Sequence, residues 1–245
     1  RVCGLHLRRL TRLPVRDNLP RLMTRPSINI WGSLRGLPRD VWVLAFASLI
    51  NRAGTMVLPF LVLYLTRELG FSASRAGLAL GVYGAGSILA APISGRLTDS
   101  IGAIPIMRAS LIVTGLLLLA YPFVTAYPGI LAITLVWAVV SEMFRPANMA
   151  MIADIVPAAQ LKPAYALTRL AINIGMSIGP ATAGFLATRS FHLIFVVDAV
   201  TTIFAAVVLI ATPLAYTHVR SAHHAGQSAR EALRPVMFDD RRMIA

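Results

Sequence analysis

The sequence predicts an all-α membrane protein with six transmembrane helices and both termini on the cytoplasmic side. The chain is 57% apolar and only 13% charged, with a mean hydropathy of +0.71, a composition that does not fit a water-exposed surface. Its charges are separated by uncharged stretches about as long as the 20 residues that a bilayer crossing needs. Its single cysteine, Cys3, excludes an internal disulfide framework.

The distances between successive charges place the spans. We expect them at residues 41–65, 77–97, 105–124, 128–152, 165–187 and 191–213 of a membrane domain covering 40–215. Only Arg52 interrupts the first span. The third and fourth divide one long uncharged stretch, because Pro122 and Pro128 disfavour helix at Tyr121 and Tyr127, the residues before them.

The Lys and Arg residues predict the orientation, because short cytoplasmic segments of membrane proteins are enriched in them. Residues 1–39 hold nine arginines and one acid, Asp17, and the segment 216–245 holds five arginines. Six crossings place both segments on one side. With Arg96, Arg108 and Lys162 of the two loops on that side, it holds 17 Lys and Arg, against three on the other. Both segments are therefore predicted to be cytoplasmic tails, and the second is alternatively the start of a central loop. This orientation accounts for the net charge of +13 without a nucleic-acid partner.

The basic N-terminal segment admits another interpretation. An Arg-rich, acid-poor segment is also typical of an organelle transit peptide, although we favour a plain cytoplasmic tail or an artefactual upstream extension. Arginine outnumbers lysine by 22 to one, which is typical of a GC-rich bacterium. The predicted location is a multi-pass position in a bacterial inner (plasma) membrane.

Three partial motifs lie on the first, second and fifth spans. The segment after the second span reads Gly95-Arg-Leu-Thr-Asp99-Ser-Ile-Gly102, which resembles the signature loop of the major facilitator superfamily. The fifth span reads Gly175-Met-Ser-Ile-Gly179-Pro180-Ala-Thr-Ala-Gly184, which resembles a pattern of the drug:proton antiporters of that superfamily, with alanine at position 183 replacing one glycine. In the first span, Gly54 and Pro59-Phe60 are similar to a pattern of the same antiporters.

The resemblance covers about residues 40–215 and implies the N-terminal six-helix half of a secondary transporter. Such transporters have two six-helix halves, hold a small molecule between them near the bilayer midplane, and alternate access by rocking. The resemblance therefore implies a second six-helix half as partner, present in a longer chain or in another subunit. It further implies proton-coupled efflux of small, drug-like compounds, with the proton gradient as energy source and no cofactor.

The resemblance also assigns roles to its motif residues. Gly95, Asp99 and Gly102 would form a cytoplasmic gate loop, in which the aspartate contacts a helix of the second half. This chain has Ser100 and Ala103 where the family usually has arginine, so the usual ion pair is lost or is supplied by Arg96 or Arg108. The alternative for Asp99 is a solvated loop acid.

In the fifth span, small residues and a proline predict a bent helix that packs closely. Gly175, Gly179 and Gly184 allow neighbouring helices to approach, and Pro180 kinks the helix. In the antiporters that the span resembles, such a helix limits leakage between the halves. The alternative is ordinary helix packing by glycine, which is common in membranes.

Charges at membrane depth predict the functional site, because each costs about 2.5–3.5 kcal/mol at a helix centre. Arg52 and Glu142 lie about 18 and 15 Å from the cytoplasmic ends of their spans. We expect them to pair on a substrate or proton path, with Asn51 and Arg145 nearby. A static ion pair is the alternative.

Asp198, in the sixth span, is the third charge at membrane depth. It predicts either a transport role or a structural hydrogen bond to a Ser, Thr or Asn side chain of a neighbouring helix.

Other chemistry finds little support in the sequence. The five histidines show no metal-ligand spacing, and the glycines of the second span form no phosphate loop with a Walker-type lysine. We therefore expect a transporter that is not an enzyme and that binds no metal, with the bilayer and a small-molecule substrate as its partners. Two alternatives stay open: a six-span permease subunit that pairs with a separate ATPase, and a non-transporting membrane scaffold or sensor.

Overall fold

The computed structural model describes residue 34 and residues 36–214 of the chain. The predicted tails at 1–39 and 216–245 lie almost wholly outside these residues. The described elements are α2 (Arg39–Ala53), α3 (Val57–Arg67), α4 (Ala73–Ile101), α5 (Ala103–Ala120), η1 (Tyr121–Phe123), α6 (Tyr127–Ile155), η2 (Ala158–Gln160), α7 (Leu161–Ala187) and α8 (Phe191–Ala211). The described part contains no strand, and the predicted all-α class is confirmed.

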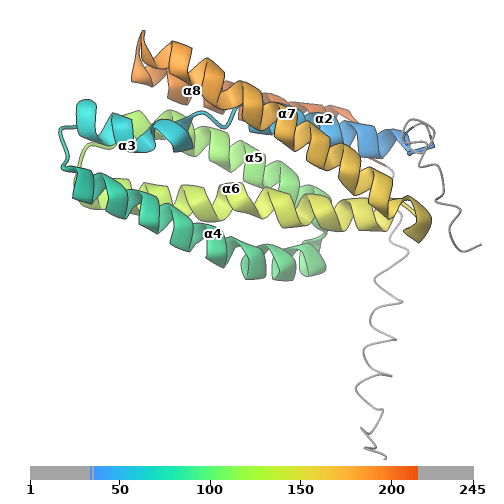
Figure 1. Cartoon of the computed structure of the whole chain (residues 1–245). Coiled ribbons are helices and arrows are strands. Elements are labelled where there is room, and N and C mark those ends of the chain that lie inside the picture. The colour runs from blue at the N-terminus through green and yellow to red at the C-terminus, as the bar shows by residue number, and fades with distance from the viewer. Residues whose placement is uncertain (1–33, 35, 215–245) are drawn as a thin grey trace, which may run out of the picture.

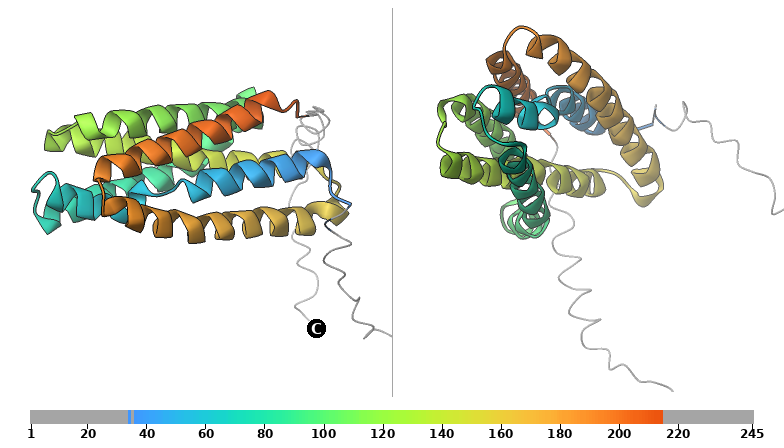
Figure 2. Two further views of the ribbon diagram at one scale, coloured as in Figure 1. Left: turned by 90° about the horizontal axis from the view of Figure 1, so that it is seen from above. Right: turned by 60° about the vertical axis from the view of Figure 1, so that its left-hand side comes forward.

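These elements form a bundle of six long apolar helices, with α2 and α3 together making the first (Figure 1). Each of the six is long and apolar enough to cross a membrane. Within the bundle α4 packs mainly on α6, and α2 packs mainly on α7. The start of α2 and the end of α8 lie at the same end of the bundle, as six crossings require (Figure 2). Which end faces the cytoplasm stays a prediction.

The first span departs from the predicted single helix, because it is interrupted between α2 and α3. Pro59 explains the interruption: in a continuous helix its ring would clash with the carbonyl of Thr55, and it supplies no N–H. In the structure Pro59 instead lies in the first turn of α3, where a proline is tolerated. Gly54 is required at the break, since a Cβ there would collide with the side chain of Thr201 on α8.

The second span also differs from the prediction. We expected Gly95 and Asp99 in a loop, but α4 continues for 29 residues through both of them and ends at Ile101. No residue between them and Ile101 breaks the helix. The reversal is concentrated at Gly102, whose φ of +91° favours glycine because a Cβ is strained there. The expected gate loop is therefore the last two turns of α4 followed by one turning residue.

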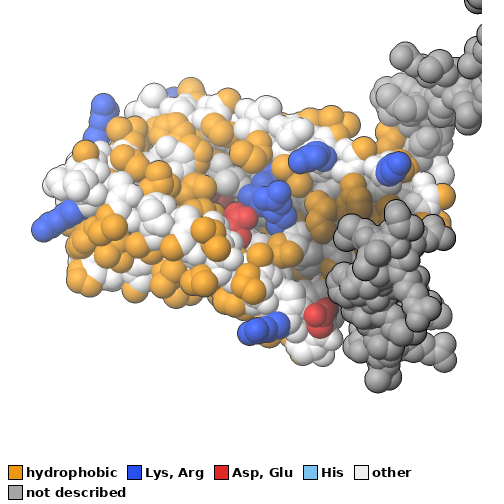
Figure 3. Space-filling model, turned by 60° about the horizontal axis from the view of Figure 1, so that its bottom comes forward, with side chains coloured by type: hydrophobic (Ala, Val, Ile, Leu, Met, Phe, Trp, Pro, Cys, Tyr) orange, Lys and Arg blue, Asp and Glu red, His pale blue; other side chains and the backbone are white. Residues whose placement is uncertain are grey.

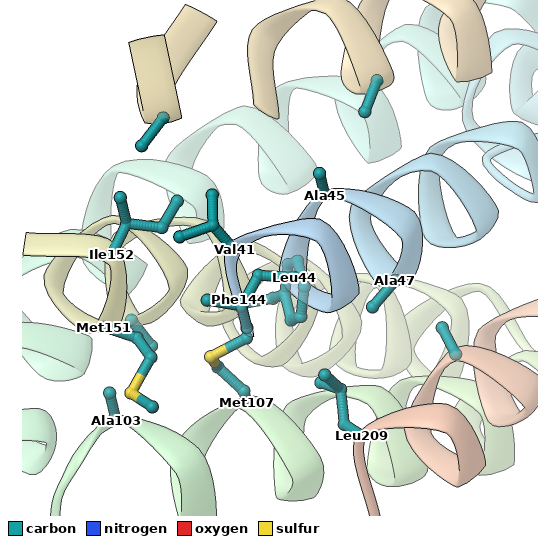
Figure 4. Packing of buried hydrophobic residues seen from close by; sticks show 14 of the residues in the cluster. Val41, Leu44, Ala45, Ala47, Ala103, Met107, Phe144, Met151, Ile152 and Leu209 are labelled. Carbon is teal, nitrogen blue, oxygen red and sulfur yellow. The ribbon is translucent and has the colours of Figure 1, made fainter. Parts of the chain in front are cut away.

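The buried apolar side chains form two clusters, one toward each end of the bundle. The first gathers the starts of α2, α5 and α7 with the ends of α6 and α8, and includes Val41, Leu44, Met107, Phe144 and Leu209 (Figure 4). The second gathers α3, the starts of α4, α6 and α8, and the ends of α5 and α7. Residues between the two clusters along each helix lie near mid-span, and there polar side chains become frequent.

Candidate functional site

The polar side chains at mid-span surround a cavity of about 30 Å³. This volume is enough for about two water molecules, since each needs about 10–15 Å³ measured in this way. The cavity is lined by Asn51, Arg52, Thr55, Tyr83, Ser110, Leu111, Thr114, Trp137, Ser141, Glu142, Asp198 and Thr202. On the face shown in Figure 3, acidic and basic side chains meet at mid-span, with hydrophobic side chains prominent toward one end.

Arg52 and Glu142 form an ion pair across this cavity. The Nη1 atom of Arg52 lies 3.9 Å from Oε1 of Glu142, and the side chains are 16% and 20% exposed. Glu142 has a second partner, because the hydroxyl of Tyr83 donates to the same oxygen at 3.3 Å. The Tyr83 ring is itself held by an edge contact with Trp137, 4.9 Å between centroids. Both contacts of the carboxylate are thus long and come from side chains.

The two residues expected near this pair are placed differently. Asn51 lines the cavity beside Arg52. Arg145 does not line it, and its side chain is exposed on α6. One helical turn separates Arg145 from Glu142, but three residues place it about 60° away from Glu142 around the helix axis, since each residue advances about 100°. Arg145 is therefore a neighbour of Glu142 along α6 that does not line the cavity, and its place beside the pair stays a prediction.

Asp198 is held by the break in the first span. Its Oδ2 atom accepts hydrogen bonds from the backbone N–H groups of Met56 and Val57, both at 3.0 Å. The hydroxyl of Thr202, one turn along α8, donates to Oδ1 at 3.4 Å. The first N–H groups of a helix lack partners within it and carry partial positive charge, so a carboxylate is favourable there. The expected hydrogen bond to a side chain of a neighbouring helix is replaced by bonds to its backbone.

Two glycines of α7 determine how closely α2 approaches, and so where Arg52 lies. A Cβ on Gly175 would fall 2.7 Å from the carbonyl oxygen of Leu49 and 2.8 Å from Cβ of Arg52. A Cβ on Gly179 would fall 3.1–3.2 Å from three carbonyl oxygens at the end of α2 and in the break. Gly184 makes no such approach, because the nearest atom would be Cζ of Phe60 at 3.8 Å. Pro180 lies inside α7, which continues through it.

The residues expected at the gate lie away from this cavity. Asp99 is exposed on the last turn of α4, and Gly95 has open space where a Cβ would extend. Arg108, one of the two arginines considered as a partner of Asp99, donates instead to the carbonyl of Leu209 through Nε and Nη2, at 3.2 and 2.7 Å. Arg108 therefore satisfies a carbonyl at the end of α8.

Sequence reasoning missed the polar residues that complete the cavity. Tyr83, Ser110, Thr114 and Thr202 were not selected, because a hydroxyl in an apolar span is common and carries no charge to mark it. Their depth offered a signal: each lies near the middle of its span, as Arg52 and Glu142 do. No group of three or more potential metal ligands occurs among the described residues.

A bundle of six membrane-length helices with a charged cavity at mid-span defines a polytopic helical membrane protein. The family model described as Major Facilitator Superfamily matches residues 42–244. The chain belongs to this superfamily, whose members are transporters and not enzymes.

Curated relatives come from bacteria. The chain is 27% identical over 169 residues to the uncharacterized MFS-type transporter YqjV of Bacillus subtilis, a match that covers 65% of this chain and 39% of that protein. It is 28% identical over 165 residues to YttB of the same organism, covering 67% and 41%. It is 26% identical over 158 residues to the quinolone resistance protein NorA of Staphylococcus aureus, covering 64% and 40%. The chain thus matches about two fifths of the length of these relatives.

Solved structures show the same fold. A crystal structure of a peptide transporter, POT, in complex with alafosfalin superimposes with a TM-score of 0.62 at 19% identity, covering 84% of this chain and 49% of that one. A structure of the same transporter with sulfate gives the same TM-score. The six-helix arrangement therefore corresponds to about half of a transporter of this fold.

Proposed function

We propose that this chain forms one six-helix half of a secondary transporter, and that Glu142 carries the proton that drives transport of a small molecule. The observation that carries the proposal is the Arg52–Glu142 pair, 3.9 Å apart and partly exposed at mid-span. Ionisable residues within membrane spans are rare because they are costly, and they commonly mark ion and substrate pathways.

The geometry of the pair suits a carboxylate that changes partners. At 3.9 Å the ion pair exceeds hydrogen-bond distance, and the Tyr83 hydroxyl at 3.3 Å is also a weak contact. Both partners are side chains, which can turn away without unfolding a helix. Glu142 can therefore pair with Arg52 when ionised and take up a proton when Arg52 moves away or binds another group.

The second half follows from the alternating-access scheme, in which a substrate lies between two bundles that rock against each other. One bundle cannot enclose a path. The six helices of this chain would pair with six more, from the same polypeptide or from another, with the start of the first span and the end of the sixth on the cytoplasmic side.

The direction of transport and the substrate class rest on similarity. NorA is named as a quinolone resistance protein, and the motifs on the first and fifth spans resemble those of drug:proton antiporters. We therefore propose efflux of small, drug-like compounds in exchange for protons, across the inner membrane of a bacterium.

Everted membrane vesicles that contain the protein test this function. After respiration has acidified their interior, norfloxacin and, separately, ethidium are added, and the release of protons is followed with a pH-sensitive dye. We expect both drug-dependent proton release and drug accumulation with the unaltered protein. Glu142→Gln should reduce proton release to the level of vesicles without the protein, because the amide cannot exchange a proton.

The matched control is Glu68→Gln, which makes the same change on an exposed side chain just after α3. It should transport as the unaltered protein does. Proton release that is fully retained in Glu142→Gln would refute the role of Glu142. Absence of drug-dependent proton release with the unaltered protein would instead favour a non-transporting scaffold.

A further inference from the structure

The cavity at mid-span touches two carboxyl groups of the described membrane domain, one half-buried and one buried. Glu142 of α6 and Asp198 of α8 both line it, and Arg52 of α2 lies on its wall as well. Asp198 is only 4% exposed, and its side chain lines the cavity. The same carboxyl holds the start of α3 through Met56 and Val57. One small polar space thus joins the ion pair to the break in the first span.

An unpaired hydroxyl indicates that this space holds water. Thr114 of α5 is 5% exposed and lines the cavity, yet its Oγ1 atom has no hydrogen-bond partner in the protein. An unpaired buried hydroxyl is costly, and a water molecule in the cavity removes that cost by bonding to it. The volume of about 30 Å³ admits such water. Water between Glu142 and Asp198 is a path for protons.

The charged and titratable groups around Asp198 come from three other helices. Arg52 lies on α2, Tyr83 on α4 and Glu142 on α6. The start of α3 faces Asp198 with backbone N–H groups, and α5 supplies hydroxyl groups to the cavity wall. Arg52 is the only cation on this wall. The single positive charge of Arg52 balances one carboxylate. If Glu142 and Asp198 share one proton, one of them is neutral and the other carries the negative charge that Arg52 balances.

We propose that Asp198 receives the proton from Glu142 through water in this cavity, and that its change of charge loosens the break between α2 and α3. The inference rests on the proposed proton-binding role of Glu142. The proton leaves the Glu142 carboxyl group, passes along the water, and ends on the Asp198 carboxylate, while Glu142 regains its charge and pairs with Arg52. Protonated Asp198 accepts the Met56 and Val57 hydrogen bonds more weakly, because bonds to an ionised acceptor are stronger. Asp198 thus becomes a positioning residue for the first span.

Infrared spectroscopy of the purified protein tests the proton step without any substrate. The C=O stretching band of protonated carboxyl groups is followed against pH, and Glu142→Gln and Asp198→Asn assign the bands of the two groups. We expect the pH midpoint of the Asp198 band to shift in Glu142→Gln, because the two groups share a proton. Thr114→Val should reduce this coupling, since it removes a water ligand at nearly constant shape.

Thr98→Val is the matched control for that variant. The Oγ1 atom of Thr98 is also buried without a partner, but it lies on α4 away from the cavity. It should leave both bands unchanged. A pH midpoint of Asp198 that is the same with and without Glu142 would refute the shared proton. If the infrared bands of Glu142 and Asp198 are coupled but the vesicles show no drug-dependent proton release, the proposed transport function is overturned and this inference is supported. If Glu142 is required for proton release but the two bands titrate independently, this inference alone is overturned.

A spin-label distance across the break tests the conformational step. Labels at Phe46→Cys on α2 and Arg67→Cys at the end of α3, in a Cys3→Ser background, lie on either side of the break. We expect the distance distribution to change on acidification, and Asp198→Asn to show the acid distribution at every pH. Asparagine keeps an oxygen that accepts from Met56 and Val57, so the fold is retained. Asp154→Asn, an exposed acid on α6, should behave as the unaltered protein. Identical distributions in Asp198→Asn and the unaltered protein would overturn the proposal.

Discussion

Glu142 and Asp198 lie on the wall of one cavity, yet the protein holds them in opposite ways. Glu142 is 20% exposed and is contacted by the side chains of Arg52 and Tyr83 at 3.9 and 3.3 Å. Asp198 is 4% exposed and accepts two backbone hydrogen bonds at 3.0 Å. Side-chain partners can leave by rotating, whereas backbone partners leave only if a helix moves. The first carboxyl therefore suits exchange, and the second suits control of helix position.

The largest expected effect is the loss of the Asp198 carboxyl group. Asp198→Ala leaves the N–H groups of Met56 and Val57 unpaired in the interior, at about 1–3 kcal/mol each. We expect the free energy of unfolding to fall by about 2–6 kcal/mol, the sum of these two costs. Titration of the protein in mixed micelles with dodecyl sulfate, followed by far-UV circular dichroism, measures it. Asp198→Asn should lose much less, because its side-chain oxygen still accepts; equal losses in both variants would show that charge, and not the backbone bonds, stabilises the break.

The contrast between the two carboxyl groups was only partly predictable from the sequence. The Arg52–Glu142 pair follows from counting depth along two antiparallel spans, since both side chains are charged and visible in the sequence. The partners of Asp198 are backbone N–H groups, which every residue except proline carries, so no residue type identifies them. The break that exposes these groups was predictable in principle, because Pro59 clashes with a continuous helix.

The fold was predicted more completely than the site, because apolar length determines the number of spans. The ends of the helices were less predictable: Gly95 and Asp99 are helical, since a helix that leaves the bilayer continues until a residue such as Gly102 turns the chain. Arg145 lies one helical turn from Glu142, as the sequence implies. The sequence does not show that its side chain is exposed and does not line the cavity.

A smaller effect is expected where α7 supports Arg52. Gly175→Ala places a methyl group 2.7–2.8 Å from Leu49, Arg52 and Ala53, so α2 and α7 must separate. Overpacking of this kind costs about 1–3 kcal/mol, and it should displace Arg52 relative to Glu142 but leave Asp198 bonded to α3. Stability is measured in the same micelle titration, and proton release in the vesicle assay.

Gly77→Ala on α4 is the control for this substitution, because an added Cβ there meets no atom within 4 Å. It should be neutral or stabilising by up to about 1 kcal/mol, the difference in helix propensity between glycine and alanine. Equal effects of the two substitutions would mean that the close approach of α7 does not determine the position of Arg52.

The smallest expected effect is the coupling energy of Arg52 with Glu142. A double-mutant cycle with Arg52→Met and Glu142→Gln isolates the energy of the pair from the cost of each change. The two atoms are 3.9 Å apart and both side chains are partly exposed, so solvent weakens their attraction. We expect a coupling of about 0–1 kcal/mol, as for other solvent-accessible pairs. A coupling well above about 1 kcal/mol, the upper range of exposed pairs, would place Glu142 in the same class as Asp198. A weak coupling would instead mean that the pair opens at little cost, as the exchange of a proton at Glu142 requires.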